Sequence, residues 1–172
     1  MKKSVFIPIF ISILSLLIIS QINCSGEEEN KQMTQQELIE LGKYIVTTSG
    51  CDDCHTPKIF TEAGPVFDTT RRFSGFPQGE KLPALDIKFV TPDKATGIGA
   101  LSEEMFIKTL REGKFMGVGR PLLPPMPWQV YGMKTDLDLK AIYSYLMSIK
   151  PINNEVPQPT PPDKMKEMLA GK

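Results

Sequence analysis

Apolar residues recur every three to four positions in three separate stretches of the chain, a spacing typical of helices with one buried face. Each stretch begins with a residue that can cap a helix: Thr34, Ser102 and Thr135. Gly113 and Pro151 mark the ends of the second and third stretches. The apolar positions are Leu38, Leu41, Ile45 and Val46; Phe106, Ile107 and Leu110; and Leu139, Ile142, Leu146 and Ile149. The pattern predicts an all-α fold with about three main helices.

The segments between these helices are irregular. Residues 56–99 and 114–133 are interrupted by prolines and glycines, and only residues 58–67 are compatible with a short hairpin. Such long irregular segments are unusual in a compact domain unless they serve a function. Loops can wrap a large rigid apolar cofactor, so we expect long fixed loops around one. The length of 172 residues suits one domain with appendages.

The first predicted helix leads into the run Cys51-Asp52-Asp53-Cys54-His55. A Cys-x-x-Cys-His run is the attachment signal for haem c. In such a site Cys51 and Cys54 bond covalently to the haem, and the His55 imidazole takes the iron as its proximal ligand. The run occurs once, so we expect one covalent haem.

Other uses of these residues fit less well. A thioredoxin-like dithiol needs a βαβ setting, and no strand–helix–strand pattern surrounds the run. A structural zinc site needs four ligands, whereas Cys51, Cys54 and His55 supply three. A disulfide between Cys51 and Cys54 would leave the adjacent histidine without a role.

The N-terminus has the pattern of an export signal. Lys2 and Lys3 precede an uncharged, strongly apolar stretch, so we interpret residues 1–23 as a lipoprotein-type signal peptide. Cys24 would be the lipidated residue, and residues 24–33 would form a flexible tether. The match to a lipobox is imperfect at Gln21 and Asn23, so an uncleaved membrane anchor or ordinary cleavage near Gly26 stays open.

Export agrees with the haem motif, because cytochromes c mature outside the cytoplasm. We therefore expect the protein on the periplasmic side of a bacterial membrane, to which it would be anchored by lipid. The alternatives are an anchor formed by an uncleaved N-terminal segment, or a soluble periplasmic protein. The haem domain would span residues 34–150, followed by a proline-rich tail at residues 151–172. The chain has 20 basic and 20 acidic residues and no basic stripe, which argues against a nucleic-acid partner.

His55 is the single histidine of the chain, so a second protein ligand to iron has to be another residue type. Among the nine methionines, position in the chain leaves Met116, Met126 and Met133. Met126 stands between prolines in a segment whose backbone is therefore restricted. We favour Met126 as the second axial ligand, with Met116 next; the alternative for either is an ordinary core methionine.

The order of helix, Cys-x-x-Cys-His, loops, Met-Pro and final helix resembles a class I cytochrome c over about residues 36–157. The resemblance implies that this family's fold surrounds the haem. It also implies a helix crossing formed by Gly42 and Tyr44 with Tyr145-Leu146. Gly64-Pro65 is similar to the family's Gly-Pro, whose proline carbonyl accepts the histidine Nδ1–H. Arg71, Arg72, Arg120 and Trp128 are candidate contacts of the haem propionates.

A closer resemblance is to cytochrome c domains that serve bacterial periplasmic dehydrogenases. The similar runs are residues 50–57, GCDDCHTP; residues 91–99, TPDKATGIG; residues 119–128, GRPLLPPMPW; and residues 138–146, DLKAIYSYL. Those relatives often carry several haem domains, and the present chain has one such motif. The resemblance implies a carrier or an accessory subunit with a dehydrogenase as a redox partner.

These observations predict a membrane-tethered monohaem cytochrome that carries single electrons by outer-sphere transfer and is not itself an enzyme. One alternative is an electron-transfer subunit of a periplasmic dehydrogenase complex. Another is a haem-based sensor in which a ligand displaces Met126. Peroxidase chemistry fits poorly, because no histidine besides His55 exists to act as an acid–base group.

Overall fold

The computed structural model describes residues 32–75 and 90–156, together with Glu167 and Ala170. From Met33 onward these residues belong to one compact unit. The predicted signal peptide, Cys24 and most of the predicted tether and tail lie outside the described residues. In the described part of the chain, no helix is long and apolar enough to cross a membrane.

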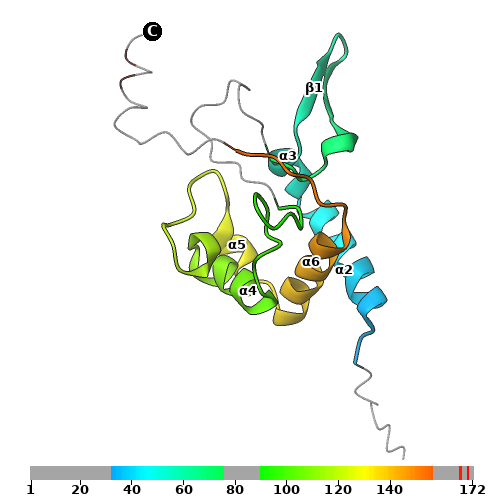
Figure 1. Ribbon diagram of the computed structural model, residues 1–172, viewed down its shortest axis with the longest axis vertical. Coiled ribbons are helices and arrows are strands. Elements are labelled where there is room, and N and C mark those ends of the chain that lie inside the picture. Colours follow the sequence, from blue (N-terminus) through cyan, green and yellow to red (C-terminus); the bar gives the residue numbers. More distant parts are fainter. Residues whose placement is uncertain (1–31, 76–89, 157–166, 168–169, 171–172) are drawn as a thin grey trace, which may run out of the picture. The chain divides into compact units, whose positions relative to one another are not determined.

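The described unit is mainly helical, which confirms the predicted all-α class (Figure 1). Its α-helices are α2 (Gln35–Thr48), α3 (Cys51–His55), α4 (Glu103–Glu112), α5 (Trp128–Tyr131) and α6 (Asp136–Ser148). Two short 3-10 helices are η2 (Thr69–Arg71) and η3 (Phe115–Gly117). A two-stranded antiparallel sheet pairs β1 (Lys58–Thr61) with β2 (Gly64–Phe67).

The three predicted helices are α2, α4 and α6, and each begins at the predicted cap. The Thr34 hydroxyl accepts a hydrogen bond from the Glu37 amide, and the Glu37 carboxylate accepts one from the Thr34 amide, which completes a capping box. Thr135 forms the same kind of capping box with Asp138 at the start of α6, and the Ser102 side-chain oxygen caps α4 by accepting from the Met105 amide. The short helices α3 and α5 and both 3-10 helices fall in segments without apolar periodicity, so the pattern did not predict them.

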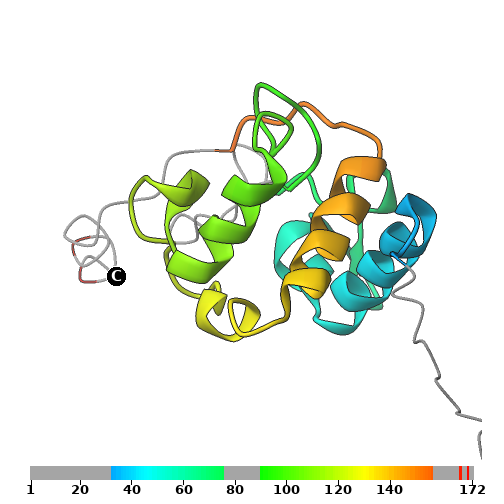
Figure 2. The same cartoon turned by 90° about the horizontal axis from the view of Figure 1, so that it is seen from below.

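Helices α2 and α6 pack side by side (Figures 1 and 2). Gly42 is the point of closest approach, because a Cβ there would lie 1.9 Å from the Ala141 carbonyl oxygen and 2.8 Å from the Tyr145 Cβ. The predicted crossing is therefore confirmed for Gly42 and Tyr145, and Ala141 takes part in it as well. Its assignment to Tyr44 was wrong: the side chain of this residue points to solvent and is 66% exposed.

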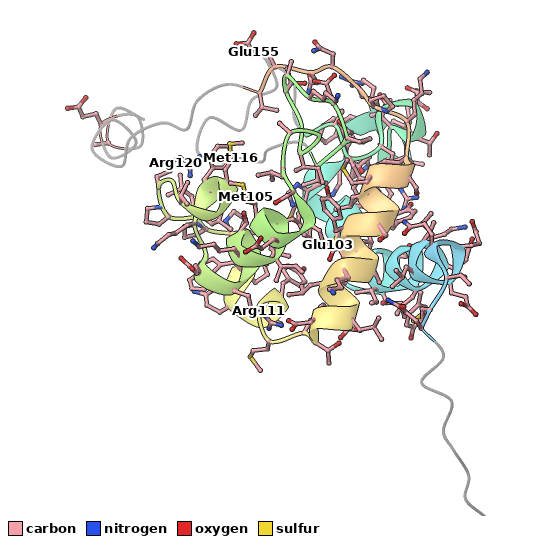
Figure 3. The ribbon with its side chains drawn as sticks, turned by 60° about the horizontal axis from the view of Figure 1, so that its bottom comes forward. Glu103, Met105, Arg111, Met116, Arg120 and Glu155 are labelled. Carbon is pink, nitrogen blue, oxygen red and sulfur yellow. The ribbon has the colours of Figure 1, made fainter. Side chains whose placement is uncertain are left out.

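The core lies between α2, α4 and α6 and extends into the loops. Its buried side chains come from these helices and from loop positions such as Phe73, Ile98 and Leu101. Arg111 connects α4 to the start of α6, since it donates hydrogen bonds to the Gly132 carbonyl and to the Asp136 carboxylate (Figure 3). The helices thus form a fixed frame on which the loops are held.

The chain after α6 continues along this frame. The Thr91 hydroxyl donates to the Ile152 carbonyl at 3.1 Å, and the Asn154 side-chain amide donates to the Ser74 carbonyl at 2.7 Å. Val156 is buried. Residues 151–156, the first part of the predicted tail, therefore pack against the loops of the domain.

Candidate cofactor site

The Cys-x-x-Cys-His run forms a single helical turn, α3. Gly50 precedes it with φ of +67°, a left-handed conformation that glycine adopts without steric cost, so the chain can turn sharply from α2 into α3. Within the turn the Asp53 amide donates to the Gly50 carbonyl, and the Thr56 amide donates to the Asp52 carbonyl, both at 3.1 Å. This geometry brings Cys51, Cys54 and His55 close together.

All three of these side chains line one large cavity of the described unit. The walls are mostly apolar and come from the five α-helices, from η3 and from the loops between them. They comprise Val46, Ser49, Gly50, Cys51, Cys54, His55, Val90, Gly97, Ile98, Leu101, Phe106, Thr109, Leu110, Phe115, Met116, Leu122, Leu123, Pro125, Met126, Pro127, Tyr131, Ile142 and Leu146. Met126 and Met116 are both part of this lining, so the structure brings the motif and the two preferred methionines to the same cavity.

The chemistry of the lining suits a haem. Two thiols, one imidazole and a thioether are soft or borderline ligands and bonding groups, and the surrounding walls can cover a large apolar ring. Cys51 and Cys54 are not joined by a disulfide in the structure. In the described part of the chain, no three His, Cys, Asp or Glu side chains are arranged to hold a metal ion, as the zinc alternative would need.

A hydrogen-bonded cluster fixes α3 from the side. Arg72 donates to Asp52 from Nε to Oδ1 at 2.8 Å and from Nη2 to Oδ2 at 2.5 Å, and its Nη1 donates to the Tyr145 hydroxyl at 3.0 Å. The Thr56 hydroxyl donates to Asp52 Oδ1 at 2.8 Å and accepts from the Phe73 amide at 3.0 Å. The cluster joins α3, the loop after η2 and α6.

The charged groups of this cluster, Asp52 and Arg72, shift each other's pKa. Burial would raise the pKa of Asp52, but hydrogen bonds from Arg72 and Thr56 outweigh burial and leave that pKa below its usual value. The hydrogen bond to Asp52 raises the pKa of Arg72. Asp52 thus stays a carboxylate. This residue, at one of the two x positions of the Cys-x-x-Cys-His run, holds α3 in place through its hydrogen bonds with Arg72 and Thr56.

The thiol of Cys51 lies in an apolar setting. Burial, followed by the charge of Asp52, raises the pKa of Cys51 to about 11. Burial also raises the pKa of Tyr131, whose hydroxyl donates to the Ser49 carbonyl at 2.9 Å. Tyr131 therefore connects α5 to the residues just before the motif, on the cavity wall.

The loop after α4 closes another part of the cavity. The Leu122 amide donates to the Gly113 carbonyl at 2.7 Å, and the Phe115 amide donates to the Arg120 carbonyl at 2.8 Å. These bonds draw the two ends of the loop together, so that Phe115 and Leu122 face the same cavity. Met116 sits at the turn of this loop with φ of +53° (Figure 3).

Three other predicted site residues do not line the cavity. Pro65 is exposed in β2 and is paired with Phe60 in the hairpin, so the structure does not bring it to the cavity wall. The guanidinium of Arg120 lies over the Phe115 ring, 5.3 Å from its centre, and donates to the Pro121 carbonyl. Trp128 begins α5, and its ring packs on Gly113.

Two further candidate arginines are engaged elsewhere. Arg71 donates to Asp68 at 2.7 Å, and Arg72 belongs to the Asp52 cluster. Neither Asp52 nor Tyr131 was predicted as a functional residue. The only signal for Asp52 was its place inside the motif, and the only signal for Tyr131 was an aromatic residue soon after Met126.

No family model matches the chain, but comparison with known proteins gives several relatives that are cytochrome subunits of dehydrogenases. The chain is 34% identical over 110 residues to the gluconate 2-dehydrogenase cytochrome c subunit of Pantoea cypripedii, which covers 64% of the chain and 23% of the relative. It is 28% identical over 144 residues to the fructose dehydrogenase cytochrome subunit of Gluconobacter japonicus, an alignment that covers 83% of the chain and 28% of the relative.

A third relative is the cytochrome c subunit of the quinone-type alcohol dehydrogenase of Gluconobacter oxydans, 27% identical over 132 residues, with 70% of the chain and 23% of the relative covered. The chain thus spans between 23% and 28% of the length of these three relatives. Their similarity, the mainly helical fold and the motif-lined cavity agree: the chain is related to the cytochrome c subunits of dehydrogenases, and its fold is compatible with that of a class I cytochrome c.

Proposed function

We propose that the cavity holds one haem c. Cys51 and Cys54 would bind it through thioether bonds, and His55 and Met126 would be the axial ligands of its iron. The observation that carries this proposal is the shared cavity: the motif of α3 and the proline-flanked Met126, 71 positions apart in the chain, line the same apolar space. The haem supplies a one-electron redox centre when bound.

The chain's own residues would hold this group in a dry and rigid setting. Core side chains such as Leu110 and Leu146 exclude water from the cavity, while the Arg72–Asp52 pair and the Tyr131–Ser49 hydrogen bond fix the turn that carries the cysteines. In such a rigid and apolar environment, the protein and the solvent reorganise little when an electron is transferred. Because His55 and Met126 would both hold the iron, small-molecule chemistry there would require displacement of Met126.

We propose that the protein carries single electrons for a periplasmic dehydrogenase, as a subunit or closely associated carrier. The names of the relatives favour this over a free carrier, since gluconate and fructose dehydrogenases each have a cytochrome subunit similar to the chain. The catalytic chemistry would belong to another chain. Nothing in the described cavity specifically favours the sensor alternative.

The axial assignment is tested by spectroscopy of the exported protein. We expect a covalently attached haem and a methionine–iron charge-transfer band in the oxidised form. Met126→Ala should abolish this band and leave haem attachment intact. Met116→Ala is the matched control, because it removes a thioether from the same cavity, and it should keep the band. Loss of the band in Met116→Ala alone would transfer the ligand role to Met116.

The redox role is tested by mixing the oxidised holoprotein with a purified sugar or alcohol dehydrogenase of the same cells and its substrate. We expect substrate-dependent reduction of the haem. Rapid carbon monoxide binding to the reduced wild type, without reduction by any dehydrogenase, would favour the sensor instead.

Lipid anchoring on the periplasmic side belongs to the same proposal. It is supported by the sequence pattern around Cys24 and by the maturation of cytochromes c outside the cytoplasm. Palmitate labelling of the wild type that disappears in Cys24→Ser would support the anchor. Labelling that is absent from both, with the protein in the soluble periplasmic fraction, would contradict it.

A further inference from the structure

The hairpin that follows the motif exposes an unusual amount of apolar side chain. Phe60 is 83% exposed, and Ile59, Val66 and Phe67 are 50%, 48% and 42% exposed. In an antiparallel pair, directly opposed residues point to the same face, and successive residues alternate between faces. Phe60, Pro65, Lys58 and Phe67 therefore share one face of the hairpin, and Ile59 and Val66 share the other.

The two edges of the hairpin are not equivalent. A two-residue turn, Glu62-Ala63, joins the Thr61–Gly64 pair, and the next pair is Phe60 with Pro65. Because proline has no amide hydrogen and hydrogen-bonded pairs alternate along an antiparallel ladder, the backbone groups of Phe60 and Pro65 point away from the hairpin. Pro65 thus removes a donor from the outer edge of β2. The outer edge of β1 keeps the Lys58 and Phe60 groups, and no backbone bond to these groups is found in the described part of the chain.

The base of the hairpin is fixed to the motif. The Asp68 amide donates to the Pro57 carbonyl at 2.9 Å, and the Asp68 carboxylate accepts hydrogen bonds from Thr70 and Arg71. Thr56 and Pro57, which join His55 to β1, are fully buried. A strand held this firmly loses little additional conformational entropy on binding, which favours recognition.

We propose that the outer edge of β1 is a docking site for an extended apolar segment of the dehydrogenase subunit that delivers electrons to the haem. The proposal rests on the proposed function. The segment would add a third strand beside β1, with main-chain hydrogen bonds to Lys58 and Phe60 and apolar side chains on both faces. An acidic residue opposite Lys58 would pair with its ammonium group. The docked subunit would then lie beside the residues that follow His55 in the chain.

Two other occupants fit the hairpin less well. A lipid surface would have to accept Glu62, an acidic residue at the tip of the hairpin. A second copy of the chain would gain too little: a stable interface buries about 800 Å² on each partner, and four partly exposed side chains supply less than that. The relatives, in contrast, are named as subunits of dehydrogenases.

A site-specific cross-link identifies the occupant. A photoreactive amino acid replaces Phe60 in the full-length holoprotein, expressed in its native cells, and the adduct is sequenced. Tyr44 on α2 is the matched control, because it is an aromatic residue of the same domain that is 66% exposed. We expect a dehydrogenase subunit to be captured at position 60 and not at position 44. Capture at position 60 of lipid, of a second copy, of the chain's own residues, of an unrelated protein, or of nothing would each overturn the proposal.

A binding measurement separates this proposal from the proposed function. Phe60→Ser should weaken the affinity for the captured dehydrogenase about tenfold, as loss of a central aromatic contact commonly does, whereas Tyr44→Ser should leave it unchanged. Haem attachment and the methionine–iron band should be unchanged in both variants. If Phe60→Ser binds and is reduced like the wild type, the docking site is excluded while the electron-carrier function stands. If no dehydrogenase reduces the wild type at all, the proposed function itself fails.

Discussion

The guanidinium of Arg72 donates two hydrogen bonds to the carboxylate of Asp52, at 2.8 and 2.5 Å, and thereby ties the loop after η2 to the turn that carries both cysteines. The same guanidinium lies over the Phe73 ring, 4.7 Å from its centre, and donates to the Tyr145 hydroxyl. Arg72 is thus a common partner of α3, the loop and α6. A lysine has neither the planar fork nor the same number of donors, so it cannot reproduce this arrangement.

We expect Asp52→Asn and Arg72→Lys each to lower the free energy of unfolding. Because the side chains are 16% and 36% exposed, the coupling between the two positions should be about 1 kcal/mol, above that of a fully exposed pair. A double-mutant cycle by denaturant unfolding of the holoprotein measures it. Lys108 and Glu112, a solvent-exposed pair on α4 at 3.9 Å, give the control cycle, for which we expect a smaller coupling. Equal coupling in the two cycles would contradict a special role of the Arg72–Asp52 pair.

Gly42→Ala tests the contact between α2 and α6. The new Cβ would lie 1.9 Å from a backbone oxygen of α6, so the helices have to move apart. We expect a loss of about 1–3 kcal/mol or more in the free energy of unfolding, the usual range for overpacking. Lys43→Ala, on the neighbouring exposed position of the same helix, should change stability little. A Gly42→Ala variant as stable as the wild type would show that the crossing is loose.

The low pKa of Asp68 determines how this residue's contribution to stability depends on pH. Hydrogen bonds from Thr70 and Arg71 lower the pKa of Asp68 from its usual 3.8 to about 2 in the folded protein. As the pH falls, Asp68 takes up a proton in the unfolded chain before it does so in the folded protein. The contribution of Asp68 to the free energy of unfolding is therefore complete above about pH 4 and disappears towards about pH 2. Unfolding of the wild type and of Asp68→Asn should therefore differ most at neutral pH, and the difference should shrink over this window. A difference that stays constant from about pH 5 to about pH 2 would rule out this linkage.

Tyr131→Phe removes the hydrogen bond to the Ser49 carbonyl and keeps the aromatic ring on the cavity wall. Loss of one such bond to a partly buried acceptor should cost about 1 kcal/mol in stability. Tyr143→Phe is the control, because it removes a comparable hydroxyl bond to the Leu101 carbonyl, at the residue before the α4 cap. We expect the methionine–iron band to change in Tyr131→Phe and to stay the same in Tyr143→Phe. An unchanged band in both variants would limit Tyr131 to a structural role.

The sequence predicted those parts of the fold that rest on local rules. Helical spacing and side-chain caps located α2, α4 and α6, because Thr34, Ser102 and Thr135 satisfy backbone donors within their own turn. The motif and the flanking prolines of Met126 indicated residues that line one cavity. These signals lie within a few neighbouring positions, so a single sequence displays them.

The remaining features depend on residues far apart in the chain. Arg72 and Asp52 are 20 positions apart in the chain, and Tyr131 and Ser49 are 82 positions apart, so no local sequence pattern predicts either contact. Pro65 was expected beside the histidine because of its family spacing, yet the hairpin carries it to an exposed strand. The short helix α5 has four residues, too few for apolar periodicity to appear.

Pro65 also bears on how the protein can avoid uncontrolled association despite an exposed apolar sheet. Fibre growth by strand addition needs two open edges, one to receive a strand and one to offer to the next molecule. Since Pro65 interrupts the outer edge of β2, the sheet can accept one strand beside β1 and cannot be extended beside β2. Even if two copies paired through their β1 edges, the resulting sheet would be closed by a proline on each side. A chain that displays Phe60 to solvent is thereby protected against open-ended polymerisation.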